Sequence, residues 1–196
     1  MISLKIFVSA LVVLILLAVY LIVVGYWPTA FVNYQPIYYK EFQTDYLISH
    51  HYYQNSLKAS GKDPVVLEAD EVKNELKRAV LESLIGERLI DEELNKIIKS
   101  QDLSRMIEDK IDKNDLNSEN FKKGSEMIYG LSPEEFKKSV LVPKAKEEIL
   151  EGRLISENNP LSNGLDGWLK EKKSRAKIII LLPGFGWNKG EVEIKK

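Results

Sequence analysis

Residues 130–150 read GLSPEEFKKSVLVPKAKEEIL, and this stretch decides how the second half of the chain folds. Ser132 is a favoured helix N-cap, Pro133 suits the first helical position, and Glu135 completes a capping box. The stretch therefore predicts a helix that begins at Pro133. Gly130, just before it, predicts a left-handed cap that ends the preceding helix.

Pro143 falls inside this predicted helix. Proline lacks an amide hydrogen and crowds the carbonyl of the residue four before it, here Ser139, at a cost of about 3 kcal/mol unless the helix bends. We predict one bent helix over residues 133–154, with its kink between Ser139 and Pro143.

Four further helical patterns lie upstream. The longest covers residues 70–99, where apolar residues recur at helical spacing and one interior glycine, Gly86, costs only about 1 kcal/mol. Residues 103–113 and 119–129 predict two shorter helices. Residues 38–60 predict a helix with an aromatic-rich face, formed by Phe42, Tyr46, His50, Tyr53 and Leu57.

Short extended segments are expected at both ends of this helical region. Residues 31–37 predict an extended piece, because Pro36 biases the residue before it away from helix. Residues 168–175 predict a short basic helix, and residues 176–182 a strand with which residues 192–194 are expected to pair. The predicted fold class is therefore mainly α, with a small β element.

The first part of the chain is apolar. Residues 6–27 carry no charge, and these 22 residues reach roughly 33 Å at helical rise, about the thickness of a bilayer core. We predict an uncleaved transmembrane anchor, with Tyr26 and Trp27 as an interfacial belt. A cleaved signal peptide is the alternative, because Lys5 precedes the apolar run, but the length of the run and Pro28 disfavour it.

The positive charges nearest to this span are Lys5 and the amino terminus, and no Lys or Arg follows the span before Lys40. The positive-inside rule places residues 1–5 in the cytoplasm and the chain after the span outside. Without Lys5 the 28 basic residues fall to 27 against 29 acidic ones, which indicates no nucleic-acid partner. The absence of cysteine fits either compartment.

Motifs for catalysis, cofactors and metals are missing or incomplete. His50 and His51 are adjacent on a helix and point about 100 degrees apart, so they do not ligate one metal from the same face. Residues 112–123 predict a solvated loop, because a calcium loop does not tolerate Leu116, Asn117 and Lys123 at its key positions. No phosphate-binding glycine motif or nucleophile elbow is present. The sequence predicts no enzyme activity, cofactor or metal.

Two surface features remain. The acidic run at residues 91–93 has lysines nearby, which is typical of a solvated, ion-paired helix face. Aromatic and methionine side chains are candidates for adaptable contacts with a polypeptide client. The candidate contact residues are Tyr38, Tyr39, Phe42, Tyr46, Tyr52, Tyr53, Met106, Met127 and Phe136. Of these, we expect Phe42, Tyr46 and Tyr53 to be core. We expect Tyr38, Tyr39 and Tyr52 to be exposed.

Taken in order, these segments resemble the N-terminal chaperone domain of the SurA, PpiD and PrsA family of bacterial extracytoplasmic folding factors. Residues 32–37, VNYQPI, are similar to the strand and turn V-N-G-x-x-I with which that domain begins. Leu84, Ile85 and Leu89 are similar to the leucine-rich core of its next helix. The SPEEF segment at residues 132–136 resembles the start of its last helix.

The end of the chain extends this resemblance. Residues 168–181, WLKEKKSRAKIIIL, are similar to the returning segment of the family, a basic helix and a strand that pairs with the first strand. The resemblance implies a SurA-N-like helical domain over residues 28–182, which leaves a tail, residues 183–196, with a possible hairpin.

Two departures from the family pattern matter. Tyr34 replaces the usual turn glycine, so either the turn differs or Asn33 takes the left-handed conformation. Family enzymes place a parvulin domain of about a hundred residues before the returning segment, whereas residues 156–165 provide only about ten turn-forming residues. The resemblance therefore implies a chaperone module that lacks the isomerase.

Two functions are left to weigh. The first is a membrane-anchored, extracytoplasmic, ATP-independent chaperone or holdase that binds unfolded or nascent exported polypeptides. The second is an envelope scaffold or assembly factor that binds one dedicated folded partner. A parvulin on another chain that docks here is the remaining, enzymatic alternative.

Overall fold

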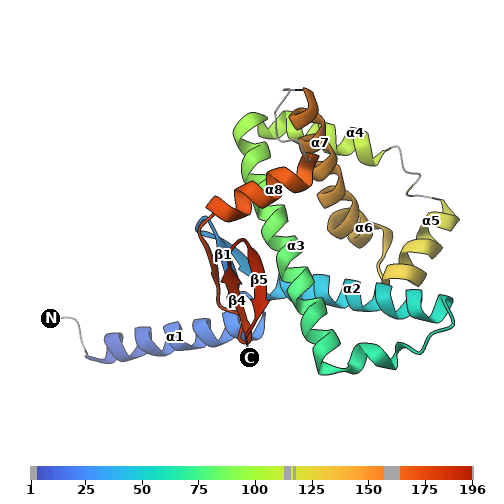
Figure 1. Cartoon of the computed structure of the whole chain (residues 1–196). Helices are drawn as coiled ribbons and strands as arrows, with labels where there is room; N and C mark the ends of the chain where they lie inside the picture. The colour runs from blue at the N-terminus through green and yellow to red at the C-terminus, as the bar shows by residue number, and fades with distance from the viewer. Residues whose placement is uncertain (1–3, 113–115, 117, 157–163, 196) are drawn as a thin grey trace.

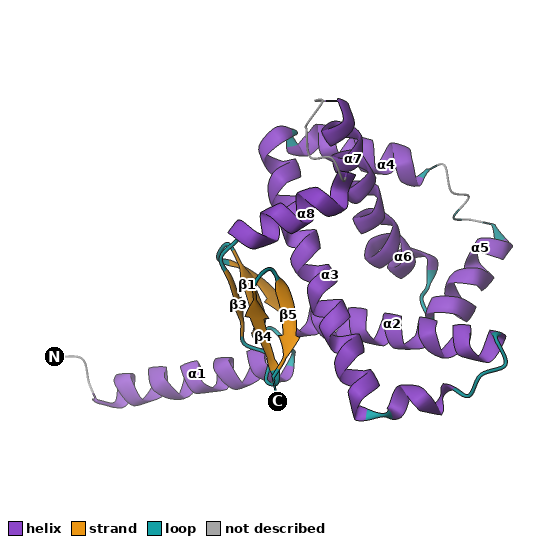
Figure 2. Cartoon of the chain, in the orientation of Figure 1, coloured by secondary structure: helices purple, strands orange, loops and turns teal. Residues whose placement is uncertain are grey.

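A computed structural model describes residues 4–112, 116, 118–156 and 164–195 of the chain. The described part is mainly helical, with two small antiparallel sheets, so the predicted fold class is confirmed (Figure 2). The helices are α1 Leu4–Val23, α2 Tyr39–Ala59, α3 Asp70–Ile97, α4 Ser100–Ile111, α5 Glu119–Gly124, α6 Pro133–Phe136, α7 Val142–Ser156 and α8 Gly164–Arg175. The 3-10 turn is η1 Pro64–Glu68, and the π-helical turns are η2 Ser125–Tyr129 and η3 Lys137–Leu141. The strands are β1 Pro28–Val32, β2 Gln35–Tyr38, β3 Ile178–Ile180, β4 Phe185–Asn188 and β5 Glu191–Ile194.

The helices upstream of Gly130 follow the predicted order. Helices α2, α3 and α4 and the pair α5–η2 lie within a few residues of the predicted ranges. Gly130 ends η2 with a left-handed φ of 70°, as predicted. Of the loop predicted over residues 112–123, positions 113–115 and 117 lie outside the described residues, and residues 119–123 belong to α5, so the loop prediction is wrong for them. Of the loop predicted over residues 156–165, positions 157–163 lie outside the described residues.

Helix α1 extends away from the helical body (Figure 1). It ends at Val23 rather than near Trp27, because Gly25 takes a left-handed φ of 79° and β1 begins at Pro28. Across the ranges described above, no helix is both long enough and apolar enough to cross a membrane. The transmembrane span predicted over residues 6–27 is therefore not confirmed.

The β1–β2 hairpin turns at Asn33 and Tyr34, which have φ values of 47° and 70°. Positive φ at both central positions is typical of a type I′ turn, whose twist matches that of the paired strands. The Asn33 side chain fixes the turn, because Oδ1 accepts a hydrogen bond from Lys177 N at 2.9 Å and Nδ2 donates to Glu92 Oε2 at 2.7 Å. The prediction for Asn33 is thus confirmed, and Tyr34 shares its conformation.

The first and last segments of the helical domain meet in one sheet, with strand order β2-β1-β3. Strand β3 runs antiparallel to β1, with Ala30 opposite Ile180 and Val32 opposite Ile178. Ala30 and Val32 are almost fully buried, so the sheet continues the hydrophobic core. The predicted pairing of the first strand with the returning segment is confirmed.

The C-terminal hairpin has a different partner from the predicted one. Strand β5 pairs with β4, where Val192 lies opposite Trp187, and not with β3. Lys189 and Gly190, with φ values of 49° and 95°, form a two-residue turn that joins these neighbours. The predicted pairing with β3 is wrong because this turn pairs β5 with β4, whereas the hairpin expected within residues 183–196 is confirmed.

Helix α3 lies at the centre of the core and crosses the middle of the molecule (Figure 1). It packs against α2, α7, α8 and the strands. Its buried side chains recur at spacings of three and four residues and are Leu76, Val80, Leu81, Leu84, Ile85, Leu89, Ile90 and Leu94. The other elements contribute Ile37, Phe42, Ile149, Leu150 and Trp168.

Segments α6, η3 and α7 follow one another without a break, and we call them the arm. Ser132 Oγ accepts from Glu135 N at 3.3 Å and the Glu135 carboxylate accepts from Ser132 N at 3.0 Å, so the predicted capping box is present. At the predicted kink, Val142 N donates to the Lys137 carbonyl, five residues back, which makes a π turn. The predicted single helix is thus confirmed, and its irregular turn lies directly before Pro143.

Candidate functional site

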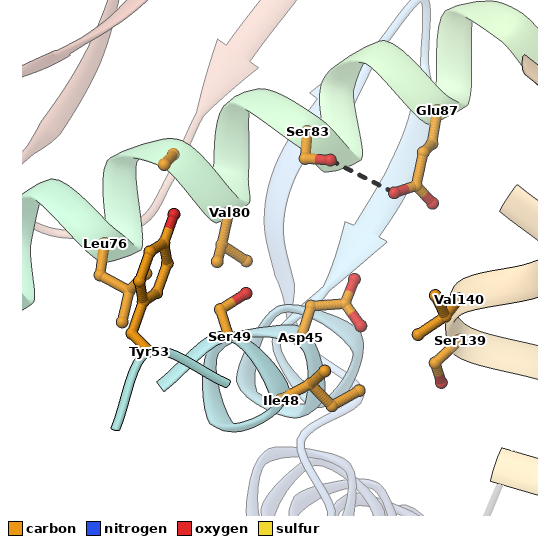
Figure 3. Close-up of a pocket in the computed structure, with 11 residues that line it drawn as sticks. Asp45, Ile48, Ser49, Tyr53, Leu76, Val80, Ser83, Glu87, Ser139 and Val140 are labelled. Carbon is orange, nitrogen blue, oxygen red and sulfur yellow. Dashed lines mark hydrogen bonds between the residues drawn. The ribbon is translucent and has the colours of Figure 1, made fainter. Parts of the chain in front are cut away.

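A cleft lies between α2, α3 and the arm (Figure 3). It consists of two cavities of about 270 Å³ and about 460 Å³, which share Asp45, Glu87 and Ser139 as lining residues. We call the two together the groove. Its apolar end is lined by Ile48, Tyr53, Leu76, Val80 and Val140. Its other end lies near α1 and is lined by Tyr26, Tyr38, Lys40 and Pro143.

The helical repeat places these side chains on the groove. On α2, Asp45 and Ser49 are four residues apart and therefore share one face. On α3, Val80, Ser83 and Glu87 follow at spacings of three and four. The π turn η3 supplies the third wall, so the groove forms only where three segments distant in sequence meet.

Asp45 and Glu87 border the same space from different helices (Figure 3). Burial raises the pKa of Asp45 to about 7, with a further contribution from the negative charge of Glu41 and an opposing one from Arg88. Burial likewise raises the pKa of Glu87 to about 7, and the negative charge of Asp45 adds to this shift. The Ser83 hydroxyl lies 3.5 Å from Glu87 Oε1.

Such a pair exchanges protons close to neutral pH and attracts cations when it is ionised. Perturbed carboxyl groups in a cleft are typical of functional sites. Neither residue is predicted from the sequence, because nothing in the local sequence shows that α2 and α3 face each other here. A usable signal was present in two acidic pairs with a spacing of four, Glu41 with Asp45 and Glu87 with Asp91.

The predicted contact residues do not form a single site. Phe42 is 2% exposed and belongs to the core, and Tyr39 and Met106 pack against the core. Tyr38 and Tyr53 line the groove at opposite ends, with exposed fractions of 38% and 49%. The core expectation is therefore right for Phe42 and wrong for Tyr53. Tyr38 is exposed as expected, whereas the expectation that Tyr39 is exposed is wrong, because Tyr39 is partly buried against the core.

Three other predicted residues lie around Tyr129. Tyr52, which is exposed as expected, stacks on the Tyr129 ring with centroids 5.3 Å apart, and Phe136 meets that ring edge-on at 4.9 Å. Met127 belongs to η2, as Tyr129 does, and is 72% exposed. Tyr46 is half-buried on α2, so it does not match the core expectation fully.

An aromatic junction connects α1 to the domain. The Trp27 ring stacks on Tyr39 with centroids 4.7 Å apart, and Tyr26 meets Tyr38 edge-on at 6.0 Å. The Lys40 ammonium lies 5.6 Å above the Tyr26 ring. Tyr39 N also donates to the Trp27 carbonyl at 2.9 Å. Because Tyr26, Tyr38 and Lys40 also line the groove, one end of the groove lies where α1 joins the domain.

The acidic run on α3 is ion-paired, as predicted, but its carboxylates are partly buried and not on a solvated face. Two of its lysine partners lie on α7 and α8, so ion pairs connect α3 with both of these helices. The pairs are Asp91 with Lys146 at 2.7 Å, Glu92 with Lys96 at 2.6 Å and Glu93 with Lys172 at 2.7 Å.

The histidines are placed separately. His50 Nε2 lies 3.4 Å from Glu68 Oε1, whereas the His51 ring lies beside Gly130. In the part of the chain that the structure describes, no three His, Cys, Asp or Glu side chains are grouped to hold a metal. The predicted lack of a metal or cofactor stays a prediction.

No protein-family model matches the chain, and neither does any curated protein or solved structure with which it was compared. The resemblance to the SurA-type domain therefore remains a prediction. The function has to be argued from the groove and the order of the elements.

Proposed function

We propose that the chain is a membrane-anchored, extracytoplasmic, ATP-independent chaperone that holds unfolded or nascent exported polypeptides in the groove. The observation that carries this proposal is the apolar end of the groove, where Ile48 and Tyr53 on α2 and Val140 on the arm are accessible side chains on two facing walls. Apolar surface of this kind binds extended chains weakly and with little sequence preference. Such binding suits a holdase, which has to release its client without ATP.

The order of the elements supports the same function. A hairpin, several helices, a capped arm and a returning strand follow one another as in the SurA-type chaperone domain that the sequence resembles. The short connection before α8 leaves no room for a parvulin domain, so we propose that the chain lacks isomerase activity.

The membrane anchor is part of the proposal. Phe7, Leu14 and Leu16 on α1 are 62–65% exposed, which water disfavours and lipid accommodates. Lys5 at the start of the chain supports an orientation with the amino terminus in the cytoplasm and the domain outside.

Aggregation of a chemically denatured client tests the chaperone function. We expect the full chain in nonionic detergent to suppress aggregation, and Ile48→Ser in the groove wall to weaken this effect. Leu47→Ser is the matched control, because Leu47 neighbours Ile48 on α2 but is 56% exposed and does not line the groove. No suppression at a several-fold excess of the wild-type chain would reject the chaperone function.

The same preparation discriminates the scaffold function. Crosslinking in membranes that yields one stoichiometric folded partner, with no affinity for unfolded peptides, would assign the chain as an assembly factor. A proline isomerisation assay on such a pair would reveal an isomerase that acts in trans.

A further inference from the structure

The groove contains charged side chains in addition to the apolar walls that the proposed client binding uses. In the cavity of about 270 Å³, the charged lining residues are Asp45 and Glu87, and both are acidic. The larger cavity adds four charged residues of both signs, which are Lys40, Glu41, Glu135 and Lys138. Two carboxyl groups therefore lie together at the middle of the groove, next to its apolar end.

Three cations on the surrounding helices are paired with other carboxylates, whereas Lys40 and Lys138 line the larger cavity and, among the described residues, form no ion pair with either central carboxyl. Over the described ranges, neither Asp45 nor Glu87 forms an ion pair. The neighbouring pairs are Arg88 with Glu41, Lys146 with Asp91 and Lys144 with Glu147. The central carboxyl groups are thus available to a cation that enters the groove from outside.

We propose that the groove selects polypeptide segments that carry an arginine or lysine, with the cationic group between Asp45 and Glu87 and apolar neighbours against Ile48, Val80 and Val140. This inference rests on the proposed function, because it names the kind of segment that the chaperone holds. Charge complementarity decides the occupant, since a half-buried carboxyl pair gains charge-assisted hydrogen bonds from such a group. Arginine is favoured over lysine because its planar fork bonds two carboxylates at once.

Proton release accompanies binding in this arrangement. Burial raises the pKa of both carboxyls to about 7, so the empty groove holds protons near neutral pH. A bound guanidinium stabilises the ionised forms and lowers both pKa values, which expels these protons. Binding therefore strengthens as pH rises through neutrality.

The other charged groups around the pair are Lys40 and Glu41 on α2, Arg88 and Asp91 on α3, and Glu135, Lys138, Lys146 and Glu147 on the arm.

Two matched peptides test the inference on the full chain in nonionic detergent. Both consist of leucine, alanine and serine around one central residue, which is arginine in one peptide and its neutral isostere citrulline in the other. At about pH 8 we expect the arginine peptide to bind about tenfold more tightly, and at about pH 5.5 less than about threefold. Calorimetry in buffers of different ionisation enthalpy should show proton release with the arginine peptide only.

Variants assign the effect to the pair. Asp45→Asn and Glu87→Gln should abolish the preference for the arginine peptide over the citrulline peptide, and circular dichroism of each variant checks that the fold is intact. Glu75→Gln is the control, because Glu75 is exposed on α3 and lies outside the groove. Equal binding of both peptides would overturn this inference and leave the chaperone function standing. If neither peptide binds, both proposals fail.

Discussion

At the scale of single residues, Asp45 and Glu87 serve the proposed binding but lower the stability of the fold as pH rises. Each has a pKa of about 7 in the folded chain, against ordinary values of 3.8 and 4.5. The folded state therefore binds more protons than the unfolded state between about pH 4 and pH 7, and the free energy of unfolding falls as pH rises through this window. Above about pH 7, Asp45 and Glu87 are two half-buried charges without an ion-pair partner in the described part of the chain, and such charges destabilise a fold.

Removing one of these charges should stabilise the protein in alkali. We expect Glu87→Gln to raise the free energy of unfolding by about 1–2 kcal/mol at about pH 8.5, after a discount for solvent screening. Near pH 4 the variant and the wild type should be equal, because Glu87 is then protonated in both states. Denaturant unfolding followed by circular dichroism measures both values.

The control for this prediction is Glu75→Gln on the same helix. Glu75 is exposed and pairs with Arg78 at 2.7 Å, so its removal should change stability little at either pH. A gain for Glu87→Gln that is the same at both pH values would contradict the assignment of the raised pKa to Glu87.

At the scale of elements, local signals predict the arm well. Ser132 and Glu135 cap it, and Pro143 marks where its hydrogen bonding becomes irregular. The sequence does not reveal that the helix accommodates Pro143 with a π turn rather than with a simple kink, because the same residues are compatible with both arrangements. The partner of β5 is not the predicted one, because Lys189 and Gly190 form a two-residue hairpin turn that pairs β5 with the strand directly before it.

Alanine substitutions at Gly86 and Gly130 should change the stability of the fold in opposite directions. We expect Gly86→Ala to stabilise the protein by about 1 kcal/mol, because Gly86 is inside α3 and an added Cβ would lie 3.8 Å from Leu169 Cδ2, an ordinary contact. Gly130→Ala should destabilise it by about 1 kcal/mol or more. Gly130 has a left-handed φ of 70°, and a Cβ there would lie 3.2 Å from the His51 ring. Thermal unfolding should show shifts of opposite sign, and shifts of equal sign would contradict this account.

At the scale of the whole molecule, the sequence predicted which segments meet at the ends of the domain but not what lies between the helices. The resemblance to the SurA-type domain implied the pairing of β1 with β3, although Val32 and Ile178 are far apart in the chain. The groove depends on how α2, α3 and the arm pack, and helical periodicity describes each helix alone. The aromatic residues of α2 show this limit, because Phe42 faces the core and Tyr53 faces the groove although the same periodic pattern includes both.

The position of α1 relative to the domain leads to a prediction about topology. The chain contains no cysteine, so a single introduced thiol reports the location of its own site. Ser60 is exposed at the end of α2, and Ser3 precedes the apolar run. We expect a membrane-impermeant maleimide to label Ser60→Cys in intact spheroplasts and to label Ser3→Cys only after permeabilisation.

The labelling pattern distinguishes the alternatives for the first 27 residues, which the positive-inside rule and the apolar run leave open. An anchored chain keeps the Ser3→Cys label in the same polypeptide as the domain, whereas a cleaved signal peptide removes it and shortens the protein. The outcome also places the groove, because Tyr26 and Tyr38 line the end of the groove that lies beside the C-terminal end of α1. In an anchored chain a client reaches the groove close to the membrane surface, where exported segments emerge. Labelling of Ser3→Cys from outside, with Ser60→Cys protected, would reverse the orientation and remove exported polypeptides as clients.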